Sequence, residues 1–246
     1  MSDQDIISVA INSPVYHYEW EGRGRAHAGY IKGMALTYAR VYSKFKTEDK
    51  FTLEMAKANT HDASKDALAW YAGIFDVMKM DNSKPGIDTL RHTWTLLLGL
   101  GMRESSGEYC TGRDRTADNV TSSTAEAGLF QVSWNSHSAN ILLPELMDSY
   151  KRSPSGLVSV FKEGVTCGSG DWENYGSGPG VVFQGLCKND PAFAAEYAAV
   201  LLRNLRAHWG PINQRAAEVR HDVDIMYQNI QKIVDDGNQN TTPLSS

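Results

Sequence analysis

The chain lacks the features that mark membrane proteins, secreted precursors and nucleic-acid binders. No apolar run approaches the roughly 20 residues that a membrane-spanning helix needs. The first residues, MSDQDIISVAINSP, have neither the basic start nor the apolar segment of a secretory signal peptide. There is no basic run, and the net charge is −5 with a pI of about 5.8. We therefore expect no membrane span and no nucleic-acid partner.

Cysteine is scarce, and metal-binding spacings are missing. Cys110, Cys167 and Cys187 are an odd number without a CxxC pair, and the seven histidines include no HExxH motif. We expect no metal and no cofactor. A Cys167–Cys187 disulfide across a glycine-rich loop and unpaired thiols both remain open, because pairing depends on the redox compartment.

The apolar pattern predicts a mostly α fold without internal repeats. With 246 residues and 41% hydrophobic content, the chain can bury a full core, as one large domain or with an appended subdomain. We expect an irregular N-terminal segment at 1–28 and a domain at 29–237, with a helical part at 29–84 and a core at 85–237. A disordered tail is expected at 238–246.

Within this layout, apolar residues at helical spacing predict several helices. They cover a stretch from Gly29, a second helix at 63–80 capped by Asp62, and a last helix that ends near Gly237. Asp190-Pro191 begins another helix. Residues 164–189 are expected to form a long loop, which inside a compact domain is usually functional or mobile.

The strongest helical signal ends in a carboxylate. A stripe with steps of three and four residues runs through Ile87, Leu90, Trp94, Leu97, Gly101 and Glu104. Burial disfavours the charged form of a carboxyl group and raises its pKa. A raised pKa suits a general acid near neutral pH, so Glu104 is the leading catalytic candidate.

Two segments after this helix are expected to form the walls of a cleft. Residues 105–128 are polar and irregular, which predicts a loop or short hairpin as one lip. If 125–134, AEAGLFQVSW, is extended, Gln131 and Ser133 face the side opposite to Phe130 and Val132. One side would then anchor in the core while the other offers polar groups to the cleft.

These residues carry a resemblance to a known family. Arg103-Glu104-Ser105-Ser106-Gly107, followed by Gly128-Leu129-Phe130-Gln131, resembles the E-S…G-L-M-Q signature of goose-type lysozymes and soluble lytic transglycosylases. The match covers about thirty central residues. The resemblance implies a lysozyme-like helical domain with a small β-hairpin or loop lip on the cleft. It also implies cleavage of the MurNAc–GlcNAc β-1,4 bond of peptidoglycan.

Carried over residue by residue, the resemblance assigns roles. Glu104 looks like the acid that protonates the glycosidic oxygen, Ser105 like the serine beside it, and Gln131 like the groove glutamine. Ser122 and Ser133 stand where goose-type lysozymes have aspartates. These serines favour transglycosylase-like chemistry, in which the sugar's own substituents assist a single carboxyl that acts as acid and then as base.

Departures from the family leave the second carboxylate open. The Glu104–Gln131 separation is longer than usual, so the lip carries an insertion, and the later A-Y-N-A-G element is missing. Asp114, Asp118 and Glu126 lie in the insertion. Any of them could position a water for hydrolysis, and Asp114 could instead contact substrate. Without such a carboxylate, attack by a muramic 6-hydroxyl would give an anhydro product.

Two alternatives to peptidoglycan cleavage remain. Gln131-Val132-Ser133-Trp134-Asn135 also resembles the Q-x-S-x-N segment of plant-type chitinases, where the serine helps to hold the attacking water. The chain could also be a non-catalytic wall-binding module, since a fold does not establish activity.

The peptidoglycan hypothesis predicts a location and partners. An antibacterial cell-wall hydrolase would act as a monomer on glycan strands, in the periplasm or the extracellular wall. Because no signal peptide is present, either the chain has been trimmed or export uses another route. An inhibitor, immunity or export protein is a further expected partner.

Overall fold

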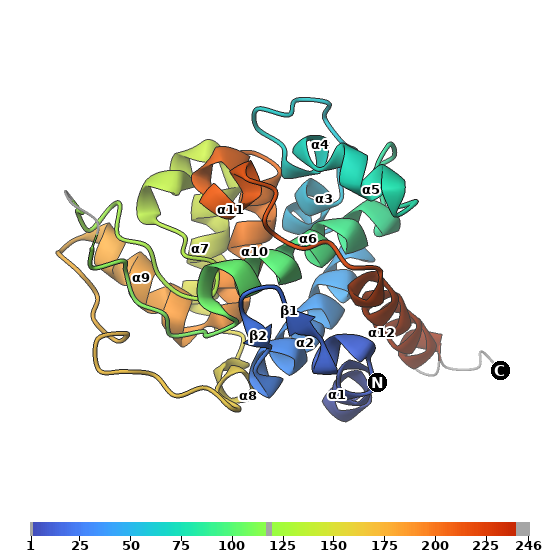
Figure 1. The fold of residues 1–246 in the computed structure, drawn as a ribbon, viewed down its shortest axis with the longest axis horizontal. Coiled ribbons are helices and arrows are strands. Elements are labelled where there is room, and N and C mark those ends of the chain that lie inside the picture. Colours follow the sequence, from blue (N-terminus) through green and yellow to red (C-terminus); the bar gives the residue numbers. More distant parts are fainter. Residues whose placement is uncertain (1, 117–119, 240–246) are drawn as a thin grey trace.

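Helix α6 (Ile87–Ser105) runs through the middle of the computed structural model, which describes residues 2–116 and 120–239 (Figure 1). Helices from both halves of the chain pack around it: α2 (Ala28–Phe45), α3 (Lys50–Met55), α10 (Pro191–Leu202), α11 (Gly210–Asn213) and α12 (His221–Gln239). The mostly α fold class is confirmed. None of the described helices is both long and apolar enough to cross a bilayer.

The remaining elements are short. They are α1 (Asp3–Ile11), η1 (Pro14–His17), β1 (Glu19–Trp20), β2 (Gly24–Arg25), α4 (Ala67–Trp70), α5 (Ala72–Val77), η2 (Trp134–Ala139), α7 (Leu142–Arg152), α8 (Val158–Phe161), α9 (Pro179–Asn189) and η3 (Arg206–His208). Strands β1 and β2 pair antiparallel, with Glu19 opposite Arg25. We call residues 106–116 and 120–128 the lip loop and residues 164–178 the tryptophan loop.

Helix α6 is buried on nearly every side along most of its length, more than a single apolar stripe predicts. Threonines on its other faces can be buried because their hydroxyls donate to backbone carbonyls one turn earlier. Thr93 donates to Thr89 and Thr95 donates to Arg91, at 2.9 and 3.0 Å. Such bonds satisfy a polar side chain within the helix itself. The helix therefore forms the core rather than covering it.

The prediction that residues 1–28 are irregular is wrong. Ser2 and Asp5 form a capping box at the start of α1. Ile6 and Ala10, four residues apart, are buried on one face of α1, which packs against α2 and α12. The β1–β2 hairpin follows and lies beside the end of α6 (Figure 1). The N-terminal segment thus belongs to the domain.

The predicted helix at 63–80 is two helices, α4 and α5, which meet at Tyr71. The cap is Asp66 and not Asp62, because the Asp66 carboxylate accepts from Leu68 N at 3.0 Å. The same carboxylate is held at 2.8 Å by Arg203 of the distant helix α10 region, and both side chains are fully buried. A tertiary ion pair therefore decides where this helix begins.

The predicted loop at 164–189 is wrong in its second half, where α9 covers Pro179–Asn189. Phe183 and Cys187, four residues apart, are buried on its inner face. The helix was missed because it is short and glycines interrupt its sequence. Farther on, α10 begins at Pro191 with Asp190 as its cap, as predicted.

The last predicted helix is confirmed as α12, with Val223, Met226 and Ile230 buried. It extends to Gln239, past the predicted end near Gly237. Residues 240–246 of the predicted disordered tail lie outside the described residues.

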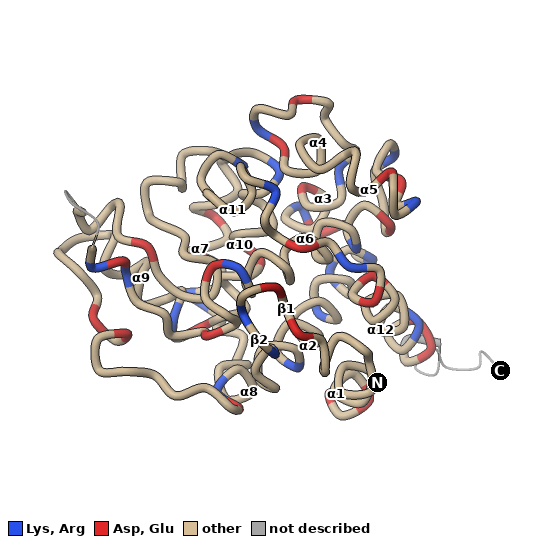
Figure 2. The backbone as a smooth tube through the Cα atoms, in the orientation of Figure 1, with Lys and Arg blue, Asp and Glu red and all other residues tan. Residues whose placement is uncertain are grey.

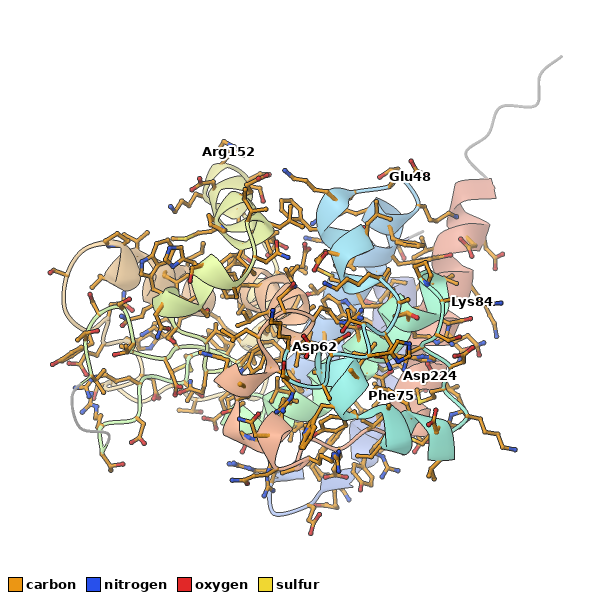
Figure 3. The ribbon with its side chains drawn as sticks, turned by 90° about the horizontal axis from the view of Figure 1, so that it is seen from above. Glu48, Asp62, Phe75, Lys84, Arg152 and Asp224 are labelled. Atoms are coloured by element: carbon orange, nitrogen blue, oxygen red, sulfur yellow. A yellow bond between two sulfur atoms is a disulfide. The ribbon has the colours of Figure 1, made fainter. Side chains whose placement is uncertain are left out.

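Buried charges pack at the start of α6. The His92 Nδ1 atom lies 2.7 Å from Asn82 Oδ1, and its Nε2 atom lies 3.6 Å from Asp224 Oδ1. The Phe75 ring stacks on the imidazole. Phe75 and Asp224, which both contact this histidine, are labelled in Figure 3. Burial lowers the pKa of His92, and the neighbouring Arg91 also lowers it, while Asp224 opposes both.

This burial predicts an acid-dependent loss of stability. Because the folded-state pKa of His92 is depressed, the unfolded chain binds its proton more readily. The free energy of unfolding should decline as the pH falls from about 6.5 toward the lowered pKa. The free energy of unfolding of His92→Gln, measured by urea titration at several pH values, should lose this part of its pH dependence. His17→Gln, a change at an exposed histidine, should keep it. An unchanged slope in His92→Gln would contradict the prediction.

Candidate active site

Glu104 is half-buried in the last turn of α6. The helix ends directly after it, because Ser106 and Gly107 have φ values of +56° and +79°. The Gly107 position has no room for a side chain, since a Cβ atom would lie 2.7 Å from the Tyr30 ring. These constraints fix the position at which the carboxyl group leaves the helix.

The surroundings of Glu104 hold its proton at neutral pH. Burial raises the pKa of Glu104 to about 7, and the negative charge of Glu126 raises it as well, while Arg23 acts in the opposite direction. Both the protonated and the ionised form of Glu104 are therefore populated near pH 7. A carboxyl group in this state can donate a proton and then accept one.

Glu126 supplies a second carboxyl group that interacts with Glu104. It lies at the end of the lip loop, and burial raises its pKa, with a smaller contribution from Asp114. Asp114 is exposed, and its carboxylate accepts from the backbone and hydroxyl of Thr116 at 2.8 and 2.7 Å. Asp118 lies outside the described residues. Of the two predicted partners that the structure describes, Glu126 is the one whose charge acts on Glu104.

Ser105 is placed differently from its predicted role in substrate binding. Its hydroxyl is buried and donates toward the carbonyls of Leu129 and Gly101, at 2.8 and 3.1 Å. This bond ties the end of α6 to the segment that carries Gln131. The hydroxyl is used inside the protein, so Ser105 supports the site rather than contacting substrate.

The predicted extended segment at 125–134 is a tight turn. Gly128 and Gln131 have φ values of +75° and +43°, and Ala127 bridges to Val132 across the turn. The alternation of faces is therefore lost. The Gln131 Nε2 atom donates to the carbonyls of Gly128 and Thr111, at 3.0 and 3.3 Å, so this amide closes the turn against the lip loop.

The structure uses the other two predicted substrate contacts in different ways. The Ser133 hydroxyl is buried and donates to Asn135 Oδ1 at 2.7 Å, which makes it part of the scaffold. At Ser122 the backbone carbonyl accepts from Gln184 Nε2 of α9 at 3.0 Å, while the side chain is only partly buried. Substrate binding by the Ser122 hydroxyl stays a prediction.

Neither of the two cysteine arrangements that the sequence left open, a Cys167–Cys187 disulfide or unpaired thiols, is found. Cys110 pairs with Cys167, with a Cα–Cα separation of 6.1 Å, and the bond joins the lip loop to the tryptophan loop. Cys187 is free and buried on the inner face of α9, beneath Gly128. Burial raises the pKa of its thiol. Because α9 is a helix, Cys187 faces the core and away from Cys167.

The sequence reasoning missed the β1–β2 hairpin as part of the site. The Arg103 Nη1 atom donates to the Glu21 carbonyl at 3.1 Å, and His27 Nε2 lies 3.5 Å from Glu108 Oε1. Charged residues of the hairpin and of the end of α6 adjoin one another in Figure 2. The turn sequence Glu21-Gly22-Arg23-Gly24 was the available signal for a hairpin.

The segment after α10 supports the turn at 128–131. The Trp209 indole donates to the Phe130 carbonyl at 2.7 Å. Burial lowers the pKa of His208, while a hydrogen bond to the Gln131 backbone raises it. The sequence has no A-Y-N-A-G element. In this structure the turn at 128–131 is instead contacted by His208 and Trp209.

Among the described residues, no group of three or more His, Cys, Asp or Glu side chains could hold a metal ion. The groups of the site with chemical potential for catalysis are the carboxyls of Glu104 and Glu126. Comparison with protein-family models, curated proteins and solved structures found no match to this chain.

Proposed function

We propose that this chain is a peptidoglycan-cleaving glycosidase with a lysozyme-like site, in which Glu104 is the general acid. The observation that carries the proposal is a half-buried carboxyl at the end of a buried helix, interacting with a second half-buried carboxyl. Glycoside cleavage requires a protonated carboxyl at the leaving oxygen and a second group at the sugar carbon. Two carboxyls with raised pKa values in one site fit these roles.

In the proposed reaction, Glu104 donates its proton to the glycosidic oxygen as the bond to the anomeric carbon breaks. Glu126 in its ionised form stabilises the positive charge that develops on the sugar or accepts the proton of the attacking group. The attacking group is a water in hydrolysis and a muramic 6-hydroxyl in anhydro formation. Glu104 regains its proton from the attacking group or, where Glu126 has accepted that proton, from solvent, and the cycle can begin again.

The Cys110–Cys167 disulfide fits action outside the cytoplasm, since disulfides persist in oxidising compartments. An enzyme in the periplasm or cell wall would meet peptidoglycan there. The bond also holds the lip loop, which carries Glu126, against its neighbouring loop.

The experiment that tests the proposal is incubation of the protein with purified peptidoglycan, followed by mass spectrometry of the released muropeptides. Release of muropeptides is the expected result. Products with a reducing muramic acid would identify hydrolysis, and products lighter by one water would identify anhydro formation. If neither product forms, the chain is not a peptidoglycan-cleaving enzyme, and the wall-binding alternative can be assessed by sedimentation with the same sacculi.

Chitin-type polymers are the second candidate substrate, because residues 131–135 carry the Q-x-S-x-N pattern that resembles plant-type chitinases. The Ser133 hydroxyl donates to Asn135 Oδ1 within this pattern, so holding a water at Ser133 would require this bond to open. Parallel incubation with β-1,4-linked GlcNAc oligomers separates the two substrates, since a muramidase should prefer the muramic-acid-containing polymer.

Replacing Glu126 by Gln should change the pH dependence of activity. The charge of Glu126 raises the pKa of Glu104, so its removal should lower that pKa, although burial will still hold it above its ordinary value. We expect the alkaline limb of kcat/KM near pH 7 in the wild type, and it should move to lower pH in the variant. An alkaline limb that stays in place would show that Glu126 does not act on the acid.

A further inference from the structure

Trp172, in the tryptophan loop, is unusually exposed for its size. It is 43% exposed, and the other large apolar residues that are exposed in the described chain are aliphatic: Leu53, Val77, Ile87, Ile141, Val182 and Ile225. Exposed indoles are unfavourable in water and are enriched where proteins bind ligands or partners. This residue lies in a segment without helix or strand, so its position needs a separate explanation.

The backbone around Trp172 is held in place from beneath. Lys188 of α9 is buried, and its Nζ atom donates to the carbonyls of Asp171 and Glu173, both at 2.7 Å. These residues directly precede and follow Trp172. Burial of this amine is unfavourable and lowers the pKa of Lys188. The buried Lys188 therefore fixes the backbone on both sides of the exposed Trp172 indole, in spite of the unfavourable burial of its amine.

A second buried side chain holds the end of the same loop. The Gln184 Oε1 atom accepts from Tyr175 N at 2.7 Å, and its Nε2 atom donates to Tyr175 O at 3.2 Å. Arg115 of the lip loop donates to the Gly170 carbonyl at 3.3 Å and pairs with Glu173 at 3.0 Å. A loop held at several points presents its side chain in one place, which reduces the entropy lost on binding.

The tryptophan loop is linked to the lip loop, which carries Glu126 of the candidate active site. The Cys110–Cys167 disulfide joins it to the lip loop, and the two loops lie side by side at the α9 side of the molecule (Figure 1). Next to Cys110, the Tyr109 ring packs edge-on against Trp172, with centroids 6.0 Å apart. Tyr109 follows Glu104 by five residues, which limits their Cα separation to about 18 Å. Trp172 is thus within reach of an oligosaccharide that extends from Glu104.

We propose that Trp172, supported by the buried Tyr109 ring, is a stacking platform for a pyranose ring of the glycan strand, a few sugar units from the bond that is cleaved. The proposal rests on the proposed function. A β-1,4-linked N-acetylhexosamine offers an apolar C–H face to the indole, while Arg115 and Glu173 beside it can bond hydroxyl and acetamide groups. The platform fixes the register of the strand and would favour long glycans over short ones.

The test uses the Glu104→Gln protein, so that glycans are bound without being consumed. Trp172→Ala in this background should weaken binding of GlcNAc hexamer and sedimentation with peptidoglycan by about tenfold, as expected for loss of one stacking partner. Trp172→Phe should retain most of the affinity. Ile141→Ala, at another exposed apolar residue, should leave it unchanged.

A second readout does not depend on the alanine variant. Binding of the hexamer should change the tryptophan fluorescence of the Glu104→Gln protein, and Trp172→Phe should remove most of this change. Unaltered glycan affinity in Trp172→Ala, together with peptidoglycan cleavage by the wild type, would overturn the platform and leave the proposed function intact. Failure of the wild type to bind or cleave either glycan would overturn both. A Trp172→Ala protein that changes only in self-association would identify a protein contact instead and overturn the platform.

Discussion

Glu104→Gln should lower kcat on peptidoglycan by about 10²- to 10⁴-fold, the range expected when a general acid is removed. Glutamine keeps the shape of the side chain but has no proton to give to the leaving oxygen. Folding should be retained, because burial raises the pKa of the wild-type carboxyl to about 7, so the site already accommodates the neutral form. Turnover is measured by release of soluble muropeptides, and folding is measured by thermal unfolding.

The matched control is Glu163→Gln, which removes an exposed carboxylate that pairs with Lys32. This variant should keep wild-type activity. A Glu104→Gln protein that retains full turnover would show that another group donates the proton, and the assignment of the acid would be wrong. Binding of glycan should survive in Glu104→Gln, so that kcat changes more than KM.

Removal of the Cys110–Cys167 disulfide should cause the largest loss of stability. The bond links positions 57 residues apart. A loop of that length predicts a loss of about 4 kcal/mol when both cysteines are replaced by serine. For a chain of this size, that loss corresponds to a fall in Tm of about 10 °C. Activity should fall as well, because the lip loop that carries Glu126 is no longer joined to its neighbour.

Thiol counting checks the pairing independently of stability. Under denaturing, non-reducing conditions one free thiol is expected, that of Cys187, and in the folded protein this buried thiol should be unreactive. Three reactive thiols would show that the bond is absent. A peptide map that links Cys167 to Cys187 would contradict the structure directly.

The long helices could be predicted from the sequence because their burial repeats over many turns. In α12 the buried apolar residues follow one face, and both α2 and α12 lie where the pattern predicts. Short helices gave no comparable signal. Helix α9 has three turns and is interrupted by glycine, and the start of α4 depends on Arg203, which is 137 residues from Asp66 in sequence. Contacts of this kind cannot be read from local periodicity.

The candidate site was predicted in part. Glu104 was singled out because a carboxylate ended an apolar stripe, and the raised pKa that this implies agrees with its surroundings in the structure. The roles of Ser105 and Gln131 were not predictable, because each bonds to backbone carbonyls that the turn at 128–131 brings close. That turn requires a left-handed backbone at Gln131. Glutamine rarely adopts this conformation, so the residue type gave no signal for the turn.

The central claim is tested most directly by the pKa of the Glu104 carboxyl, measured by carbon-13 NMR with labelled glutamate and assigned with Glu104→Gln. We predict a titration midpoint of about 7, which decreases in Glu126→Gln. A midpoint near 4.5, the ordinary value for glutamate, with no response to Glu126→Gln would contradict the account.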